Sequence, residues 1–302
     1  MNHSKTFIVS HDAGGAEVVS SWVRCHPEYQ YYFCLDGPAV EIFHKKIANL
    51  DNQSTAYLGQ FIHKSDWILT GTSWASDLEK EAIELAKEQN KKVVSFLDHW
   101  VNYPQRFEYN GRICLPDEIW VGDDDALKIA QNCFPQEKLR LVVNPYFQDI
   151  THELKIIKAP SKQTTKTRIL YVCEPIEEHS MRECGHPLHW GYTEYDAMRF
   201  FFKTLPGIIS MDTMDCIRVR HHPSEEHNKY DTIVQAYPAL PIQKSERNSL
   251  VEDCVWTDWV VGCNSMALVV GLLAKKKVYS CIPPGGTFCS LPQEGIIKLM
   301  ER

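Results

Sequence analysis

One segment near the start of the chain, residues 11–17, has the residue types of a substrate site. Asp12 is a carboxylate that could deprotonate an acceptor hydroxyl, although capping of the helix that follows is an equally good interpretation. Gly14 and Gly15 permit a tight turn and close approach of a ligand to the backbone. Their spacing is not G-x-G-x-x-G, so we do not expect a dinucleotide here. We expect Asp12 to be a catalytic base and the two glycines to contact substrate.

Two further polar segments lie in the same half of the chain. Thr72 and Ser73 offer small hydrogen-bond donors beside an aromatic residue, with a capping loop as the alternative. Asp98, His99 and Trp100 directly follow an apolar run, and an acid, an imidazole and an indole together suit a sugar site. Asp98 holding the ring of His99 in one tautomer would serve acid–base catalysis, and a sugar ring could stack on Trp100 or Tyr103. The alternative is a buried structural pair of Asp98 and His99.

In the second half, two apolar runs end in residues that could bind a phosphate. His222 and Pro223 follow one run, and Asn264 and Ser265 follow another. An imidazole donor and a serine hydroxyl at a helix start would stabilise charge on a departing nucleotide without a metal. The alternative is that Pro223 only ends a strand and Ser265 only caps a helix.

Several common sites are not indicated. No Walker loop, G-x-S-x-G elbow or H-E-x-x-H motif is present. The acidic run Asp123 to Asp125 is typical of a helix start rather than of a metal site. A zinc site could be drawn from four residues of one segment, Cys173, His179, Cys184 and His186, but their spacing matches no standard zinc pattern. We therefore expect neither a metal nor a cofactor.

These segments need elements to position them, and the first half alternates between strands and helices. Short apolar runs predict strands, and each is followed by a helical pattern. The strands are expected at 7–10, 31–35, 67–70, 93–97, 118–121 and 141–143, and the helices at 16–24, 39–47, 77–89 and 126–132. This alternation predicts a parallel sheet covered on both faces.

The second half repeats the pattern after a Lys-, Thr- and Ser-rich linker expected at 151–167. Residues 174–191 contain two prolines and two glycines and predict a loop. Strands are expected at 168–173, 216–220, 259–262 and 277–282, and helices at 193–204 and 266–274. The predicted fold class is α/β, with two Rossmann-like, doubly wound parallel-sheet domains facing a cleft. We expect residues 1–150 to form the domain that binds the acceptor, and residues 151–302 to form the domain that binds the nucleotide.

Composition narrows the partners. The formal net charge is −7, whereas a nucleic-acid binder usually carries a basic excess. No apolar stretch approaches the roughly 20 residues of a membrane span. The chain begins without a signal-peptide pattern, and its 11 cysteines, an odd number, suggest reduced thiols. We expect a cytoplasmic protein without nucleic-acid partners, and the sequence leaves a homodimer open.

Residues 219–225 (VRHHPSE) and 260–268 (VVGCNSMAL) give the second half a family resemblance. It resembles the nucleotide-binding half of GT-B glycosyltransferases, most of all bacterial sialyltransferases, polysialyltransferases and the glycerophosphotransferases of capsule and wall synthesis. The resemblance implies that His222-Pro223 and Asn264-Ser265 contact the nucleotide. The family's serine motif is normally a pair, whereas here Asn264 precedes a single Ser265. The acidic catalytic motif of the sialyltransferases has only Asp12 as a loose match.

The resemblance implies metal-independent glycosyl transfer from a nucleotide sugar to a glycan or small-molecule acceptor, in bacterial surface polysaccharide synthesis. Asp12, or the pair of Asp98 and His99, would deprotonate the acceptor hydroxyl. A nucleotide-sugar epimerase or hydrolase on the same scaffold is the first alternative, because a fold does not decide a reaction. A sugar- or nucleotide-binding protein without catalysis is the second.

Overall fold

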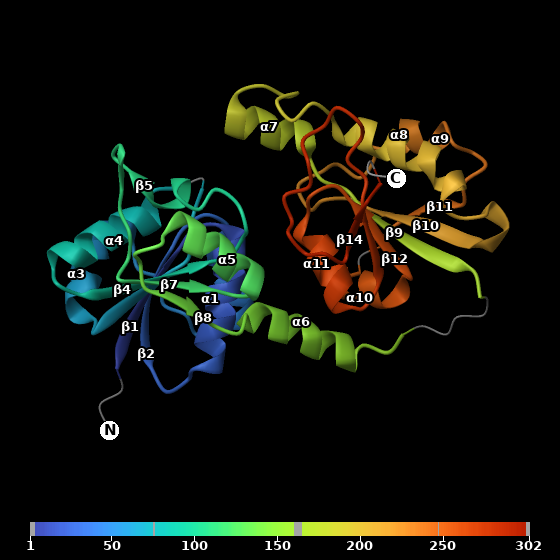
Figure 1. Cartoon of the computed structure of the whole chain (residues 1–302). Helices are drawn as coiled ribbons and strands as arrows, with labels where there is room; N and C mark the ends of the chain where they lie inside the picture. Colours follow the sequence, from blue (N-terminus) through green and yellow to red (C-terminus); the bar gives the residue numbers. More distant parts are fainter. Residues whose placement is uncertain (1–3, 75, 160–164, 247, 300–302) are drawn as a thin grey trace. The chain divides into compact units, whose positions relative to one another are not determined.

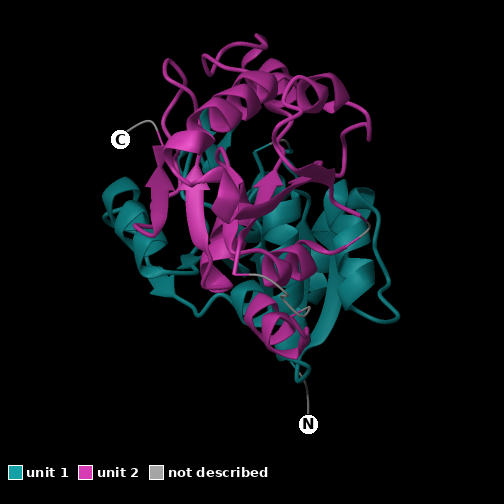
Figure 2. Ribbon diagram, turned by 90° about the vertical axis from the view of Figure 1, so that its right-hand side faces the viewer, with its two compact units in different colours: residues 1–149 teal, residues 150–302 magenta. Residues whose placement is uncertain are grey.

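The computed structural model describes residues 4–74, 76–159, 165–246 and 248–299. The chain divides into two compact units, Met1–Asp149 and Ile150–Arg302, each built on its own parallel sheet (Figures 1 and 2). The predicted fold class of two Rossmann-like α/β halves is confirmed. None of the helices in the described part of the chain has the length and apolar character that a bilayer crossing needs.

Unit 1 has a six-stranded sheet in the order β2-β1-β3-β4-β7-β8, with all pairs parallel. Its strands are β1 (Lys5–Ser10), β2 (Gln30–Leu35), β3 (Trp67–Thr70), β4 (Lys92–Leu97), β7 (Glu118–Val121) and β8 (Leu139–Leu141), with a small hairpin of β5 (Glu108–Tyr109) and β6 (Arg112–Ile113). Its helices are α1 (Ala13–Cys25), α2 (Pro38–Lys46), α3 (Leu58–Lys64), α4 (Leu78–Glu88) and α5 (Asp124–Cys133), with short 3₁₀ turns at Thr55–Tyr57 and Gln105–Phe107.

The central strands of unit 1 are buried on both faces. In β1, Phe7, Ile8 and Val9 are all 0% exposed, as expected for consecutive apolar residues in a parallel strand between two helical layers. Phe7 stacks on Phe61 of α3, whereas Ile8 belongs to the apolar cluster that includes α1 and α2. Neighbouring residues of the strand therefore pack against opposite layers, with α3 on one side of the sheet and α1 and α2 on the other.

Unit 2 has a six-stranded parallel sheet in the order β11-β10-β9-β12-β13-β14. In Figure 1, α8 and α9 lie on one side of this sheet and α10 and α11 on the other. The strands are β9 (Thr167–Val172), β10 (Met214–Arg220), β11 (Ile242–Lys244), β12 (Trp259–Gly262), β13 (Lys277–Ser280) and β14 (Ile296–Lys298). The helices are α7 (Ile176–Cys184), α8 (Glu194–Thr204), α9 (Asp231–Gln235), α10 (Leu250–Trp256) and α11 (Met266–Leu273), with 3₁₀ turns at Leu205–Gly207 and Met211–Thr213.

Strand order creates a switch point in each sheet. In unit 1 the connection after β1 leads to β2 on one side, and the connection after β3 leads to β4 on the other side. In unit 2 the connections after β9 and β12 lead to β10 and β13, again in opposite directions. Ligands of open α/β sheets bind outside the carboxyl ends of the strands at such points, because the two loops diverge there. Asp12 and Thr72 follow β1 and β3, and Ser265 follows β12, so these residues lie at the two switch points, whereas Asp98 follows β4 and His222 follows β10.

Some predicted elements were wrong. The linker predicted at 151–167 is helical at its start, because α6 (Pro145–Ile156) begins at the Asn144 cap and crosses the unit boundary; residues 160–164 lie outside the described residues. The loop predicted at 174–191 contains α7, which Gly185 ends in the left-handed conformation. The strand predicted at 141–143 lies two residues earlier, because β8 begins at Leu139 and ends at Leu141. The strand predicted at 277–282 is β13, and a further strand that was not predicted, β14, follows it.

Candidate functional site

Asp12 is the best-placed carboxylate at the switch point of unit 1. It occupies the N-cap position of α1, yet its side chain makes no capping bond there. Its Oδ2 instead accepts a hydrogen bond of 2.8 Å from the backbone N–H of Trp74, and its Oδ1 lies 2.8 Å from Nδ1 of His11. Burial alone would raise the pKa of Asp12, but the bonds from His11, Trp74 and Ser73 outweigh it and lower that pKa. Asp12 is therefore an ionised carboxylate whose side chain is 24% exposed.

The predicted glycines serve the packing of α1 against neighbouring loops. A Cβ on Gly14 would lie 2.0 Å from Oδ2 of Asp98, so only glycine lets that carboxylate approach the first turn of the helix. A Cβ on Gly15 would lie 3.2 Å from the backbone of Gly71 and Thr72. Gly15 is buried and Gly14 exposed, so of the two only Gly14 presents its backbone to solvent.

Asp98 is paired with Arg106, a residue that the sequence analysis missed. Nη1 of Arg106 donates to Oδ1 of Asp98 and to the hydroxyl of Thr72, each at 3.0 Å, and Thr72 donates to the same Asp98 oxygen at 2.9 Å. Both charged side chains are at least nine-tenths buried. Arg106 lies in a 3₁₀ turn well beyond β4, so no local spacing signals this contact.

The predicted hydrogen bond between Asp98 and His99 is wrong for the described residues. Nδ1 of His99 accepts a bond of 3.0 Å from the backbone N–H of Trp100, which leaves the ring proton on Nε2. Burial lowers the pKa of His99 and so keeps the ring neutral. The physical reason is that Asp98 already accepts hydrogen bonds from Arg106 and Thr72, and the bond from the charged guanidinium is of the stronger, charge-assisted kind.

Trp100 has little ring surface to offer a sugar. The residue is 5% exposed, and its indole N–H lies 3.1 Å from both carboxylate oxygens of Asp123. Asp123 also accepts from the backbone N–H of Ala126 and caps α5, so the capping interpretation of this acidic run is confirmed. The predicted stacking of a substrate on Trp100 is not favoured by this burial.

Glu79 is a second residue that the sequence analysis missed. It lies in the first turn of α4, is 2% exposed, and accepts the backbone N–H of His11 at 2.7 Å through Oε1. Among the described residues, Oε2 has no hydrogen-bond partner. Burial, together with the nearby charges of Asp12 and Asp98, raises the pKa of Glu79 to about 8. Glu79 is thus a protonated acid at neutral pH, beside the ionised Asp12.

Replacing Glu79 by Gln is expected to flatten the pH dependence of stability. The unfolded chain loses the Glu79 proton near pH 4.5, whereas the folded chain keeps it until about pH 8. Stability from this group is therefore present below pH 4.5 and is lost as the pH rises to about 8. Urea unfolding at pH 5 and pH 8.5 should show that Glu79→Gln loses less free energy of unfolding over this interval than the parent. An equal loss in the two proteins would contradict the assignment.

At the switch point of unit 2, a carboxylate of the protein itself already occupies the start of α11. Glu174 follows β9 and accepts from the backbone N–H of Cys263 at 2.7 Å and of Asn264 at 3.0 Å. Burial raises the pKa of Glu174 to about 7, against the lowering effect of these donors. The N–H groups expected to bind a phosphate are therefore taken by Glu174, another residue that no local pattern signals.

Asn264 and Ser265 have structural partners. The hydroxyl of Ser265 accepts the N–H of Ala267 at 3.1 Å and caps α11, which is the alternative interpretation of this residue. The side-chain amide of Asn264 donates to the hydroxyl of Ser290 at 2.9 Å and accepts the Ser290 backbone N–H at 2.9 Å. A phosphate at this helix start would have to displace or share these bonds.

His222 keeps one nitrogen for a ligand. Nδ1 lies 2.8 Å from the hydroxyl of Ser224 and 3.3 Å from its backbone nitrogen, while the backbone N–H of His222 donates to Glu225. Burial lowers the pKa of His222, which favours the neutral ring. Because Nδ1 accepts the backbone N–H of Ser224, the ring proton lies on Nε2 and can be donated there. Pro223 is exposed in the turn that follows β10.

The zinc site that could be drawn around Cys173 is not formed. Within the residues that the structure describes, no group of three or more His, Cys, Asp or Glu side chains is arranged to hold a metal ion. Cys173 is buried at the end of β9, whereas Cys184 is exposed at the end of α7.

Solved structures show the same architecture. The UDP-GlcNAc 2-epimerase of Methanocaldococcus jannaschii matches with a TM-score of 0.59 and 10% identity, over 91% of this chain and 83% of that protein. The S. aureus MnaA–UDP co-structure matches with 0.59 and 10%, over 92% and 79%, and MurG of Acinetobacter baumannii with 0.54 and 9%, over 93% and 79%. The chain has a GT-B-like fold. At such low identity the likeness shows the fold alone.

The GT-B-like fold agrees with the broad resemblance expected from the sequence. These structural matches do not single out sialyltransferases or glycerophosphotransferases, so the finer resemblance is not supported by them. No protein-family model and no curated protein sequence matches the chain. The residues at the carboxyl ends of the two sheets are therefore the observations that bear on function.

Proposed function

We propose that the chain is a metal-independent glycosyltransferase that takes its sugar from a nucleotide-activated donor. The observation that carries this proposal is the ionised, partly exposed carboxylate of Asp12 at the switch point of unit 1. The shared fold supports the nucleotide, because proteins with this architecture include UDP-GlcNAc 2-epimerases and one solved with UDP. The proposed setting is bacterial surface polysaccharide synthesis.

In this proposal, unit 1 binds the acceptor and unit 2 the nucleotide. Asp12 removes the proton from the acceptor hydroxyl as that oxygen attacks the anomeric carbon of the donor sugar. The bond from the anomeric carbon to the nucleotide phosphate breaks, and the Nε2–H of His222 donates to the phosphate oxygen that gains charge. A carboxylate base suits an oxocarbenium-like transition state, as in glycoside hydrolysis.

A nucleotide-sugar epimerase is the second candidate, because several matches of this fold are UDP-GlcNAc 2-epimerases. The two functions differ in whether an acceptor is needed. We would incubate the chain with nucleotide sugars, with and without sugar acceptors, and follow the products by NMR. A new glycosidic bond supports transfer, whereas isomerised donor without acceptor supports epimerisation and rejects transfer.

His222→Ala is expected to abolish nucleotide-dependent stabilisation. A ligand that binds only the folded chain raises its stability by RT ln(1 + [L]/Kd), so a saturating nucleotide should raise the Tm by several degrees. The panel is CMP, CDP, UDP, GDP and dTDP, measured by thermal shift. The matched control is His63→Ala, an exposed histidine of α3 in unit 1. If the selective shift persists in His222→Ala, His222 does not hold the nucleotide.

A further inference from the structure

A surface groove of about 350 Å³ lies on unit 1 around Trp74. Its walls come from three places in the sequence: the loop after β3, the start of α4, and the segment that runs through the β5–β6 hairpin. The lining residues are Trp74, Asp77, Lys80, Gln105, Glu108, Asn110 and Gly111. A volume of this size suits a small polar ligand.

The groove combines an aromatic ring with hydrogen-bonding side chains. Trp74 is 39% exposed, unlike the buried Trp100. Gln105, Glu108 and Asn110 are exposed members of the same lining and bring amide and carboxylate groups. Aromatic faces bind the C–H surface of a sugar ring, while amides and carboxylates bind its hydroxyls. The residue types therefore fit a pyranose.

The hairpin that forms one wall is held in one conformation. Asn110 and Gly111 both have positive φ, at 50° and 74°, and connect the paired strands β5 and β6 as a two-residue turn. Such a turn matches the twist of the strands and needs Asn and Gly at these positions. The backbone at the tip thus has a defined turn geometry, and a loop that is already ordered loses less entropy when a ligand binds.

The charges of the groove disfavour an anionic ligand. Asp77 and Lys80 neutralise one another through an ion pair of 2.9 Å. Glu108 then adds one negative charge to the lining, which contains no second cation. A carboxylated or phosphorylated sugar would be repelled, whereas an uncharged sugar would be accepted.

The groove adjoins the proposed base. The backbone N–H of Trp74 donates to Oδ2 of Asp12 at 2.8 Å, so the residue that carries the exposed ring also touches the catalytic carboxylate. From these observations we propose that the Trp74 groove is the acceptor subsite and that it takes an uncharged pyranose stacked on Trp74. This inference rests on the proposed glycosyl transfer for its role, though its binding can be measured alone.

The test is direct sugar binding without a donor, by saturation-transfer NMR. The probes are the methyl pyranosides of glucose, galactose and N-acetylglucosamine, with methyl glucuronide as the anionic comparison. We expect at least one neutral probe to bind more tightly than the glucuronide. Trp74→Ala should weaken that binding roughly fivefold, since a ring contact is worth about 1 kcal/mol, and Trp74→Phe should recover part of the loss.

The matched control is Tyr57→Ala, which removes another exposed aromatic ring of unit 1 outside the groove. It should leave binding unchanged. Equal affinity in Trp74→Ala and the parent, a preference for the glucuronide, or no binding by any neutral probe would each overturn the subsite. If the neutral sugar binds through Trp74 and no transfer to it occurs with any donor, the subsite stands and the proposed function fails.

Discussion

Asp12→Asn is expected to lower kcat by about 10² to 10⁴, the usual contribution of a general base. Asn has the shape of Asp, and its side-chain oxygen can still accept the backbone N–H of Trp74. It cannot take a proton from an acceptor hydroxyl. Nucleotide affinity and thermal stability should therefore change little while turnover falls. The measurement is kcat and KM for donor and acceptor, with nucleotide binding measured separately.

The matched control for Asp12 is Asp36→Asn. Asp36 is an exposed carboxylate that follows β2, the strand next to β1 in the sheet. Its replacement should leave kcat near the parent value. A kcat for Asp12→Asn within about threefold of the parent, below the smallest effect expected of a base, would show that another group removes the proton.

The pH profile adds an independent check of the same residue. Because its hydrogen bonds lower the pKa of Asp12, the carboxylate stays ionised well below neutral pH. The base should therefore not limit kcat/KM between pH 5 and pH 7. A loss of activity on lowering the pH through this interval would point to a base with a higher pKa, such as Glu79, whose pKa is about 8.

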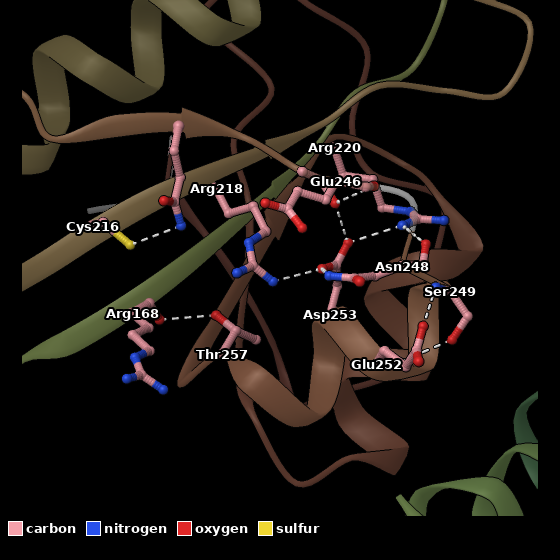
Figure 3. Close-up of polar contacts among 12 residues, drawn as sticks. Arg168, Cys216, Arg218, Arg220, Glu246, Asn248, Ser249, Glu252, Asp253 and Thr257 are labelled. Atoms are coloured by element: carbon pink, nitrogen blue, oxygen red, sulfur yellow. Dashed lines mark hydrogen bonds and ion pairs between the residues drawn. The ribbon is translucent and has the colours of Figure 1, made fainter. Parts of the chain in front are cut away.

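Asp253→Ala is expected to cost unit 2 about 3 kcal/mol of unfolding free energy. The Asp253 side chain is 0% exposed and lies 2.8 Å from Nη1 of Arg218 and 2.8 Å from Nη1 of Arg220 (Figure 3). Ser245 also donates to it, at 2.6 Å. Removing the carboxylate leaves two guanidinium groups facing one another without their counter-charge.

The expected cost is at the low end for a buried pair. The arginine side chains are 15% and 23% exposed, so water compensates in part for the lost carboxylate. Arg218 also lies 3.6 Å from the ring centroid of Trp256, a contact that survives the substitution. Urea unfolding should show the loss in the transition of unit 2.

The control for Asp253 is Asp212→Ala in the exposed 3₁₀ turn at Met211–Thr213, which should change stability by less than about 0.5 kcal/mol. Asp253→Asn should fall between the two, because the amide oxygen can still accept one hydrogen bond. If Asp253→Ala unfolds like the parent, the two arginines do not depend on this carboxylate.

Local pattern was enough for most strands and for the helix starts with side-chain caps. The bounds predicted for β3, β7 and β12 agree with the structure to the residue, because short apolar runs between turn residues are a property of the segment itself. Caps are likewise local. Ser265 and Asp123 each bond an N–H two or three residues ahead, so the sequence alone indicates them.

The expected loop at 174–191 and linker at 151–167 show where local composition misleads. Proline and glycine can begin and end a helix as well as interrupt one, and α7 lies between Pro175 and Gly185. Likewise α6 has Pro145 at its start and runs into the Lys- and Thr-rich stretch. In both cases proline or glycine lies at a helix end, and the composition alone cannot distinguish a short helix bounded by such residues from a continuous loop.

The sequence by itself determined the alternation, the two halves and the polar segments at the strand ends. Only the tertiary structure decided which charges meet. Glu79 reaches His11, Arg106 reaches Asp98, and Glu174 reaches the start of α11. The contacts of Glu79 and Glu174 depend on strand order, because β1 lies beside β3 in one unit and β9 beside β12 in the other. Arg106 reaches Asp98 because the segment after β4 folds back on itself. Strand order follows from the packing of whole helices across a sheet, a long-range property that no spacing within a segment records.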